Sequence, residues 1–167
     1  MSKRFNGMFK VCMFFAVFAF AAAAIPASAA CEAAPKQDDD AAVRQVFVDS
    51  VTIGLVKGLQ LSGKEVSPEQ QAKLRGIAEE FFPRIYARIK AAGFGEDYKK
   101  QMFDPEIRQF DRQMLETKTV QEVSPLAQKQ MKIFHDKYPK LFEFMNTDPE
   151  LQAAAMDMLR KISEALK

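Results

Sequence analysis

The sequence predicts an all-α protein, a compact bundle of about five to six helices that follows an N-terminal signal peptide. Three observations lead to this prediction. Apolar residues recur at three- and four-residue spacing from residue 41 to the end of the chain. Serine–proline and aspartate–proline pairs mark helix starts within the same part of the chain. No stretch shows the sustained alternation, rich in β-branched residues, that is typical of strands.

The first 30 residues have the layout of a secretory signal. Three basic residues fall within the first ten positions, and the uncharged run 11–25 that follows has 15 residues. Pro26 ends this run, and small residues follow it, as is usual before a cleavage site. Because a membrane span needs about 20 apolar residues, we interpret 1–30 as a signal peptide and expect export to a bacterial periplasm or envelope.

Residues 31–40 contain no large apolar side chain, which predicts a flexible tether. Cys31 begins the tether, and the other cysteine, Cys12, lies in the leader, so the processed chain has no internal disulfide. Two hypotheses stay open for Cys31. Either cleavage just before it leaves a free thiol, or residues 28–31 act as a lipobox and Cys31 carries lipid. The resemblance to bacterial lipoproteins is partial, because Ser28 stands where they usually have a large aliphatic residue.

The charge of the processed chain gives no sign of a nucleic-acid partner. Without the leader, 21 basic residues face 22 acidic ones, a formal charge of −1 with the histidine neutral. No block of lysine and arginine remains that could neutralise a run of phosphates. The remaining residues, about 137, suit a single helical domain over 41–167. Membrane contact is expected only through the leader or through lipid on Cys31.

Four helix starts can be recognised from a capping side chain followed by proline. Proline suits the first helical position because its missing N–H would have no partner there. The four pairs are Ser67-Pro68, Asp104-Pro105, Ser124-Pro125 and Asp148-Pro149. Gln70 stands three residues after Ser67, which predicts a capping box. The acidic run 38–40 suits the start of a further helix before them.

Apolar stripes define the helical segments. They cover residues 43–59, 74–89, 107–114, 133–145 and 151–166. Gly93 follows the second stripe and is predicted to cap that helix at its C-terminus. Pro83 and Pro139 fall inside two of the segments, and each is expected to kink its helix or to split it.

The two halves of the helical region carry features in the same order. In 67–115 and again in 124–159, a Ser-Pro start is followed by an aromatic-Pro-basic-aliphatic-aromatic string, an Asp-Pro-Glu start and a Met-Leu pair. The strings are 82–86 and 138–142. Two interpretations stay open: a duplicated, kinked helical hairpin packed about a pseudo-twofold axis, or unrelated helices that share ordinary capping signals.

The sequence offers little for catalysis, metal binding or cofactors. His135 is the only histidine, too few for a zinc or copper site, and we interpret it as a partly exposed helix residue beside Phe134 and Asp136. No Gly-x-Ser-x-Gly elbow and no phosphate-binding glycine loop occurs. We therefore predict a protein that is not an enzyme and that has no cofactor or metal. An enzyme without a recognisable motif remains an alternative to the two hypotheses for function given below.

Aromatic residues are numerous for a domain of this size and fall on more than one helix face. One interpretation is a binding surface, for which we select Phe82, Tyr86, Phe94, Tyr98, Phe142 and Phe144. The other is that the helices are sandwiched on two sides, so that the rings enter the core. The methionines lie largely on or near the apolar stripes, where they fill the core or add an adaptable groove.

The segment 66–74, Val-Ser-Pro-Glu-Gln-Gln-Ala-Lys-Leu, resembles the Leu-Thr-Pro-Glu-Gln helix start of the Spy/CpxP family of periplasmic stress chaperones. The similarity covers nine residues of the 167. Val-Ser replaces Leu-Thr, and residues 123–126 lack the Glu-Gln of the family's second such motif. The resemblance implies a small, exported helical protein that cradles client chains.

Together these observations give two main hypotheses for function. The first is a non-catalytic binding or chaperone-like module of the cell envelope, which binds a protein or a hydrophobic ligand through an aromatic and methionine-containing helical surface. The alternative is a structural or assembly subunit of the envelope that forms homo-oligomers through the same rings.

Overall fold

The structure is a computed structural model that describes residues 40–167. The predicted signal peptide 1–30, Cys31 and all but the last residue of the predicted tether 31–40 lie outside the described residues. All regular secondary structure in the described part is α-helical, which confirms the predicted fold class. Its helices are α2 (Asp40–Leu61), α3 (Pro68–Ala91), α4 (Gly95–Phe103), α5 (Pro105–Glu116), α6 (Val120–Lys137), α7 (Pro139–Thr147) and α8 (Pro149–Ala165).

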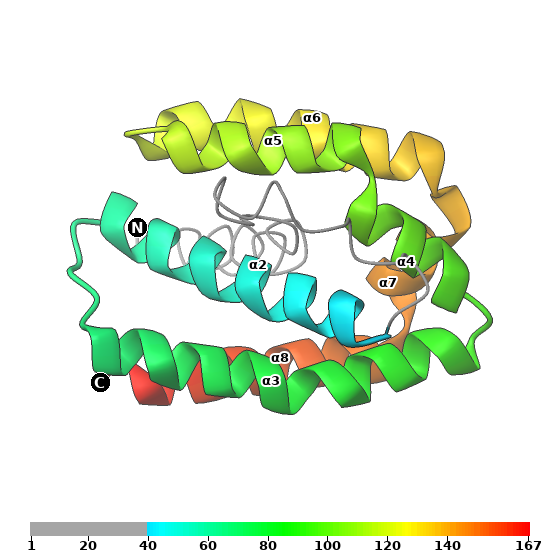
Figure 1. The fold of residues 1–167 in the computed structure, drawn as a ribbon, viewed down its shortest axis with the longest axis horizontal. Helices are drawn as coiled ribbons and strands as arrows, with labels where there is room; N and C mark the ends of the chain where they lie inside the picture. Colours follow the sequence, from blue (N-terminus) through cyan, green and yellow to red (C-terminus); the bar gives the residue numbers. More distant parts are fainter. Residues whose placement is uncertain (1–39) are drawn as a thin grey trace, which may run out of the picture.

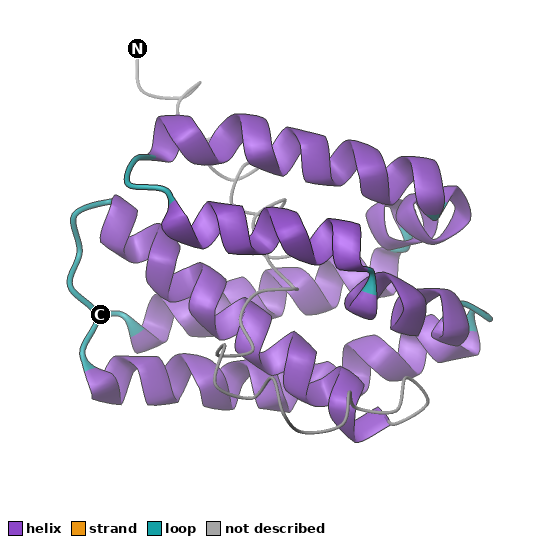
Figure 2. Ribbon diagram, turned by 45° about the horizontal axis from the view of Figure 1, so that its top comes forward, coloured by secondary structure: helices purple, strands orange, loops and turns teal. Residues whose placement is uncertain are grey.

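The helices form two layers that are joined at one end (Figure 1). In one layer α3 packs against α2 and α8, and in the other α5 packs against α6. The short helices α4 and α7 join the layers, since α4 packs against α3 and α5 while α7 packs against α6 and α8. Figure 2 shows from a second direction that α2 lies between α5 and α3.

The core is built from the apolar stripes that the sequence contains. On α3, Leu74, Ile85 and Ile89 are at most 1% exposed, and burying each such side chain contributes about 1.5–3 kcal/mol. Their partners come from the flanking helices, for example Val43 on α2 and Ile162 on α8. The spacing therefore predicted correctly which side of these helices is buried.

The described part has seven helices, one more than the highest number expected. One reason is Pro139, which separates α6 from α7 and so confirms the predicted split. Pro83, by contrast, lies inside α3, which continues on both sides of it. The other reason is α4, because the segment after Gly93 forms a helix of its own that the stripes did not reveal.

Three of the four predicted helix starts are confirmed. The amide of Gln70 donates to Ser67 Oγ at 3.1 Å, and the amide of Ser67 donates to Gln70 Oε1 at 3.0 Å, which completes the capping box. Asp104 and Asp148 cap α5 and α8. The nine residues that resemble the Spy/CpxP helix start thus include a true capping box.

Gly93 ends α3 as predicted, with φ at +85°, a backbone conformation that favours glycine. The amide of Phe94 donates to Ile89 O at 3.0 Å and the amide of Gly93 donates to Lys90 O at 2.9 Å. This is the Schellman arrangement, which satisfies carbonyl groups left over at the end of a helix.

The predicted start at Ser124-Pro125 is wrong. The helix α6 begins five residues before Pro125, at Val120, and its N-cap is Thr119, whose Oγ1 accepts from the amide of Glu122 at 3.3 Å. Glu122 Oε2 in turn accepts from the amide of Lys118 at 2.8 Å. The Thr-x-x-Glu spacing at this earlier position provides two capping bonds, whereas Pro125 is tolerated inside the helix.

We therefore expect Thr119→Ala to lower the free energy of unfolding by about 1 kcal/mol, the usual cost of losing an N-cap. Ser124→Ala is the matched control, and it should change this free energy by no more than about 0.5 kcal/mol because Ser124 is exposed inside the helix. Urea unfolding measures both values. A larger loss in the Ser124 variant would restore the original prediction.

Candidate functional site

Three of the six rings selected as a binding surface lie in the core. Phe82, Tyr86 and Tyr98 are 5%, 3% and 2% exposed. They continue a series of aromatic contacts from Phe47 on α2, with ring centroids 5.4 Å apart for Phe47–Phe82, 5.1 Å for Phe82–Tyr86 and 5.8 Å for Tyr86–Tyr98. Because α2, α4 and α8 cover α3 on several sides, rings on more than one face of α3 are buried. For these three residues the surface prediction is corrected.

The other three rings are half-buried and form two separate groups. Phe94 packs on Phe144 with centroids 5.1 Å apart, and the Arg88 guanidinium lies 5.7 Å from the Phe144 ring. Phe142 instead makes T-shaped contacts with Phe134 and His135, with ring centroids 5.3 Å and 5.2 Å apart. All three also pack against the core. The selected rings therefore do not form one continuous face.

The methionines follow the core-filling interpretation at four positions. Met102, Met114, Met145 and Met158 are buried, with Met145 the most exposed of them at 6%. Met131 is half-buried, and Met156 is 54% exposed. Together with Val120, Met156 is one of two large apolar side chains that are well exposed in the described part.

His135 is an exposed residue of α6, as predicted. Its Nδ1 lies 3.4 Å from Asp136 Oδ1, and its ring is nearly perpendicular to that of Phe142. Within residues 40–167, no group of three or more His, Cys, Asp or Glu side chains is arranged to hold a metal ion. None of the helices in the same range combines the length and the apolar character needed to cross a membrane.

Asp104 is the first of two buried carboxylates, each of which connects the start of one helix to the end of another. It is 8% exposed, and its Oδ1 accepts from the amides of Glu106 at 2.9 Å and Ile107 at 3.3 Å. Lys137 Nζ, at the end of α6, donates to both carboxylate oxygens at 3.0 Å, and Tyr138 Oη donates at 3.1 Å. Burial opposes the ionisation of Asp104, but these bonds together hold its pKa below the usual value.

Asp148 is the second such carboxylate. It is 6% exposed, and its Oδ1 accepts from the amide of Leu151 at 3.0 Å. Arg88, in the last turn of α3, donates to both of its oxygens, from Nη2 at 2.5 Å and from Nε at 3.2 Å. The Arg88 guanidinium holds the pKa of Asp148 below its usual value.

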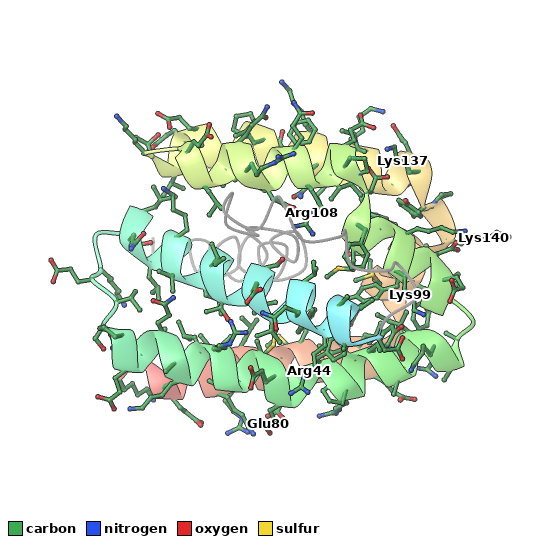
Figure 3. The ribbon with its side chains drawn as sticks, viewed as in Figure 1. Arg44, Glu80, Lys99, Arg108, Lys137 and Lys140 are labelled. Carbon is green, nitrogen blue, oxygen red and sulfur yellow. The ribbon has the colours of Figure 1, made fainter. Side chains whose placement is uncertain are left out.

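The two carboxylate sites have the same plan. In each, a basic residue from the last turn of a long helix binds the N-cap aspartate of an Asp-Pro-Glu helix and also lies near its glutamate. Lys137 lies 2.7 Å from Glu106, and Arg88 lies 3.7 Å from Glu150. Figure 3 shows Lys137 at the end of the bundle where α4 meets α5. Both sites hold helices together, and both leave their carboxylates fully engaged.

A third ion-pair cluster fixes the start of α2. Asp40 accepts from Tyr86 Oη at 2.7 Å and from Lys90 Nζ at 3.1 Å, and Lys99 Nζ lies 3.3 Å away. The Tyr86 hydrogen bond, followed by those of the two lysines, lowers the pKa of Asp40 to about 2. This cluster attaches the first residue of α2 to α3 and α4.

Three buried side-chain polar atoms of the described part have no hydrogen-bond partner: Ser50 Oγ on α2, and one atom each of Asp111 on α5 and Gln130 on α6. Asp111 and Gln130 are 1% and 2% exposed, and Gln130 Nε2 donates to Asp111 Oδ1. Asp111 Oδ2 and Gln130 Oε1 have no hydrogen-bond partner within residues 40–167. Burial is the main cause that raises the pKa of Asp111 to about 7. This pair was not predicted from the sequence, although Asp111 lies four residues after Ile107 and three before Met114, on the apolar stripe.

One pocket, of about 240 Å³, lies between α3 and the start of α8. Its walls are Arg84, Arg88, Pro149, Glu150, Leu151, Ala153 and Ala154. Arg88 is already bound to Asp148 there, and Arg84 lies 3.9 Å from Asp157. The pocket is therefore small, and its cations face carboxylates of the same chain.

Comparison of this chain with protein-family models, with curated proteins and with solved structures finds no match. The site must be interpreted from its own geometry. That geometry consists of capping carboxylates, ion pairs between helices and one buried acid–amide pair.

Proposed function

We propose that this chain is an exported, non-catalytic helical module of the cell envelope, which binds an apolar segment of another protein or a hydrophobic ligand in the manner of a chaperone. The observation that carries the proposal is the position of α2. This helix has apolar side chains on the side that packs on α3 and also on a neighbouring side.

The packing of Phe47 on Phe82 marks the side of α2 that faces α3. At 100° per residue, Val48, Thr52 and Leu55 form a stripe about 80–140° around the helix from Phe47, on a neighbouring side. Val48 and Thr52 are 1% and 3% exposed, and Leu55 is half-buried. This second stripe supports a role for α2 beyond holding α3 in place.

The arrangement of the layers also supports the proposal. The α5–α6 pair takes its close backbone contacts mainly from α4 and α7, while α2 takes its own mainly from α3 and α4 (Figure 1). The two layers are thus joined chiefly at one end. Opening of the two layers about that end exposes the α2 stripe to an apolar ligand. Closing of the layers then shelters the stripe and the bound ligand from water.

We also propose that the two halves arose by duplication, with a different alignment from the one the proline strings suggest. Each half has a long helix, a helix of nine residues, and a helix with an Asp-Pro-Glu start. The matching units are then α3–α4–α5 and α6–α7–α8, and each long helix packs on the last helix of the other unit. The paired carboxylate sites support this alignment. Superposition of the two units with the same hand tests it.

The binding proposal can be tested with the processed protein and two matched variants of α2. Leu55→Ser changes the second stripe, and Leu61→Ser changes a half-buried leucine on another side of the same helix. We expect a hydrophobic fluorescent probe and an unfolded client protein to bind the wild type, and to bind the Leu55 variant at least about threefold more weakly. The Leu61 variant should bind like the wild type. Circular dichroism checks that both variants stay helical.

Equal binding by the wild type and both variants, or no binding at all, would overturn the proposal. The assembly alternative has less support, because well-exposed large apolar side chains of the described part are limited to Val120 and Met156. Analytical ultracentrifugation separates the two functions, since a strict monomer at tens of micromolar removes the assembly subunit.

A further inference from the structure

The Asp111–Gln130 pair lies where a charge is least well tolerated. Asp111 is on the inner stripe of α5 and Gln130 faces it from α6, and both side chains are almost fully buried. An ionised carboxylate in such a place needs several donors to offset its lost hydration. Asp111 receives one, from Gln130 Nε2.

While Asp111 is ionised, the pair has no hydrogen left to donate to its two remaining buried acceptors. Gln130 Nε2 has two N–H groups, which donate to Asp111 Oδ1 and to Ile107 O, the latter at 3.3 Å. Asp111 Oδ2 and Gln130 Oε1 remain, and both are acceptors while the acid is ionised. Two acceptors cannot bond to each other, but a carboxylic acid can donate one hydrogen to an amide oxygen.

We propose that Asp111 and Gln130 form a proton-binding site between α5 and α6, in which a proton taken from solvent onto Asp111 Oδ2 is donated to Gln130 Oε1. The amide and the acid then form a cyclic pair with two hydrogen bonds. Each oxygen that lacked a partner gains one, and the buried charge disappears. The site acts as a pH-sensitive lock on the α5–α6 layer, and it does not depend on the proposed binding function.

The charges around the pair act against protonation but do not dominate. Arg108 and Arg112, both on α5, favour the ionised acid. Arg108 points to the side of α5 that is turned toward α2 (Figure 3), and it donates to Met102 O at 3.3 Å. Gln130, which faces Asp111 from α6, is neutral. On α4, the charge of Lys99 is directed to Asp40 and Glu96. Burial, the largest influence, favours the neutral acid.

The sign of the pH effect follows from the raised pKa of Asp111. Its pKa of about 7 in the folded protein lies above the ordinary 3.8, so the folded state holds its proton more tightly than the unfolded chain does. The stabilising contribution is complete below the ordinary value and is lost as the pH rises through about 7. The other aspartates with shifted pKa values in the described part all shift downward, so they stay ionised over this interval.

The direct test is a carbon-13 NMR titration of the aspartate side-chain carboxyls in the processed protein. We expect one carboxyl, assigned to Asp111 by its absence from the Asp111→Asn spectrum, to titrate near the neutral value given above. Titration of this carboxyl near the ordinary aspartate value would overturn the proposal.

A second measurement uses Asp111→Asn, because the asparagine amide can accept one hydrogen bond from Gln130 and donate another to it without a titratable proton. The wild type should lose urea resistance between about pH 5 and about pH 8, and the variant should not. Asp136→Asn, at an exposed aspartate of α6, is the matched control and should keep the wild-type pH profile. A wild-type urea midpoint that is the same at both pH values contradicts the lock, whether or not the Asn variant folds.

Discussion

Phe82→Ala is expected to lower the free energy of unfolding by about 3–5 kcal/mol, the usual cost of removing a buried phenylalanine ring. The ring is 5% exposed and lies between Phe47 of α2 and Tyr86 of its own helix. Its removal leaves a cavity in the series of rings that joins α2, α3 and α4. Because these helices approach one another through bulky rings, we expect the cavity to collapse only in part.

Phe144→Ala is the matched control from the same predicted binding surface. Phe144 is half-buried and contacts Phe94 and the Arg88 guanidinium at the edge of the core. Its loss should cost clearly less than the loss of Phe82, about 1–2 kcal/mol. Urea unfolding followed by circular dichroism measures both variants. Similar small losses in the two variants would mean that Phe82 does not lie in the core.

The difference between these two rings shows what the sequence could predict. Helical spacing identified the buried side of α3 through Leu74, Ile85 and Ile89, because one packed side is enough to produce that pattern. Phe82 lies beside this stripe, and its burial depends on α2, a helix that packs on a second side of α3. Spacing along one helix contains no information on how many neighbours that helix has.

Helix boundaries were predictable where one capping signal stood alone. Ser67, Asp104 and Asp148 cap the helices as predicted. At α6 two signals compete, and Thr119 with Glu122 provides two side-chain bonds that Ser124-Pro125 does not. Proline is also tolerated within a helix at the cost of one backbone hydrogen bond, so its presence alone could not decide the boundary.

The polar chemistry of the core was the least predictable part. Asp104 was expected to cap a helix, but its bonds to Lys137 and Tyr138 join residues more than 30 positions apart in the chain. Asp111 lies in an apolar stripe, and a polar residue at such a position could have predicted a buried polar group in the core. Its partner on α6 could not be named before the packing of α5 on α6 was known.

Asp104→Ala is expected to lower the free energy of unfolding by about 2–3 kcal/mol, because it removes an N-cap, breaks the ion pair with Lys137 and leaves the half-buried Tyr138 hydroxyl without its acceptor. Asp104→Asn should recover part of this loss, since asparagine caps helices well but carries no charge for Lys137. The lowered pKa of Asp104 adds a pH signature. Its contribution is present at neutral pH and is lost as the pH falls through the lowered value, so both variants should lose less stability in acid than the wild type.

Asp148→Ala is the natural comparison, because its carboxylate caps α8 and binds Arg88 in the way that Asp104 caps α5 and binds Lys137. We expect Asp148→Ala also to lower the thermal midpoint. The free energy of unfolding that the double variant loses should equal the sum of the losses in the two single variants. Additivity is expected because Arg88 and Lys137 are different partners, and the two carboxylates share none. A double variant that loses much less than this sum would show that the two sites depend on each other. The two layers would then be coupled through α4 and α7, and the two carboxylate sites could not be treated as independent.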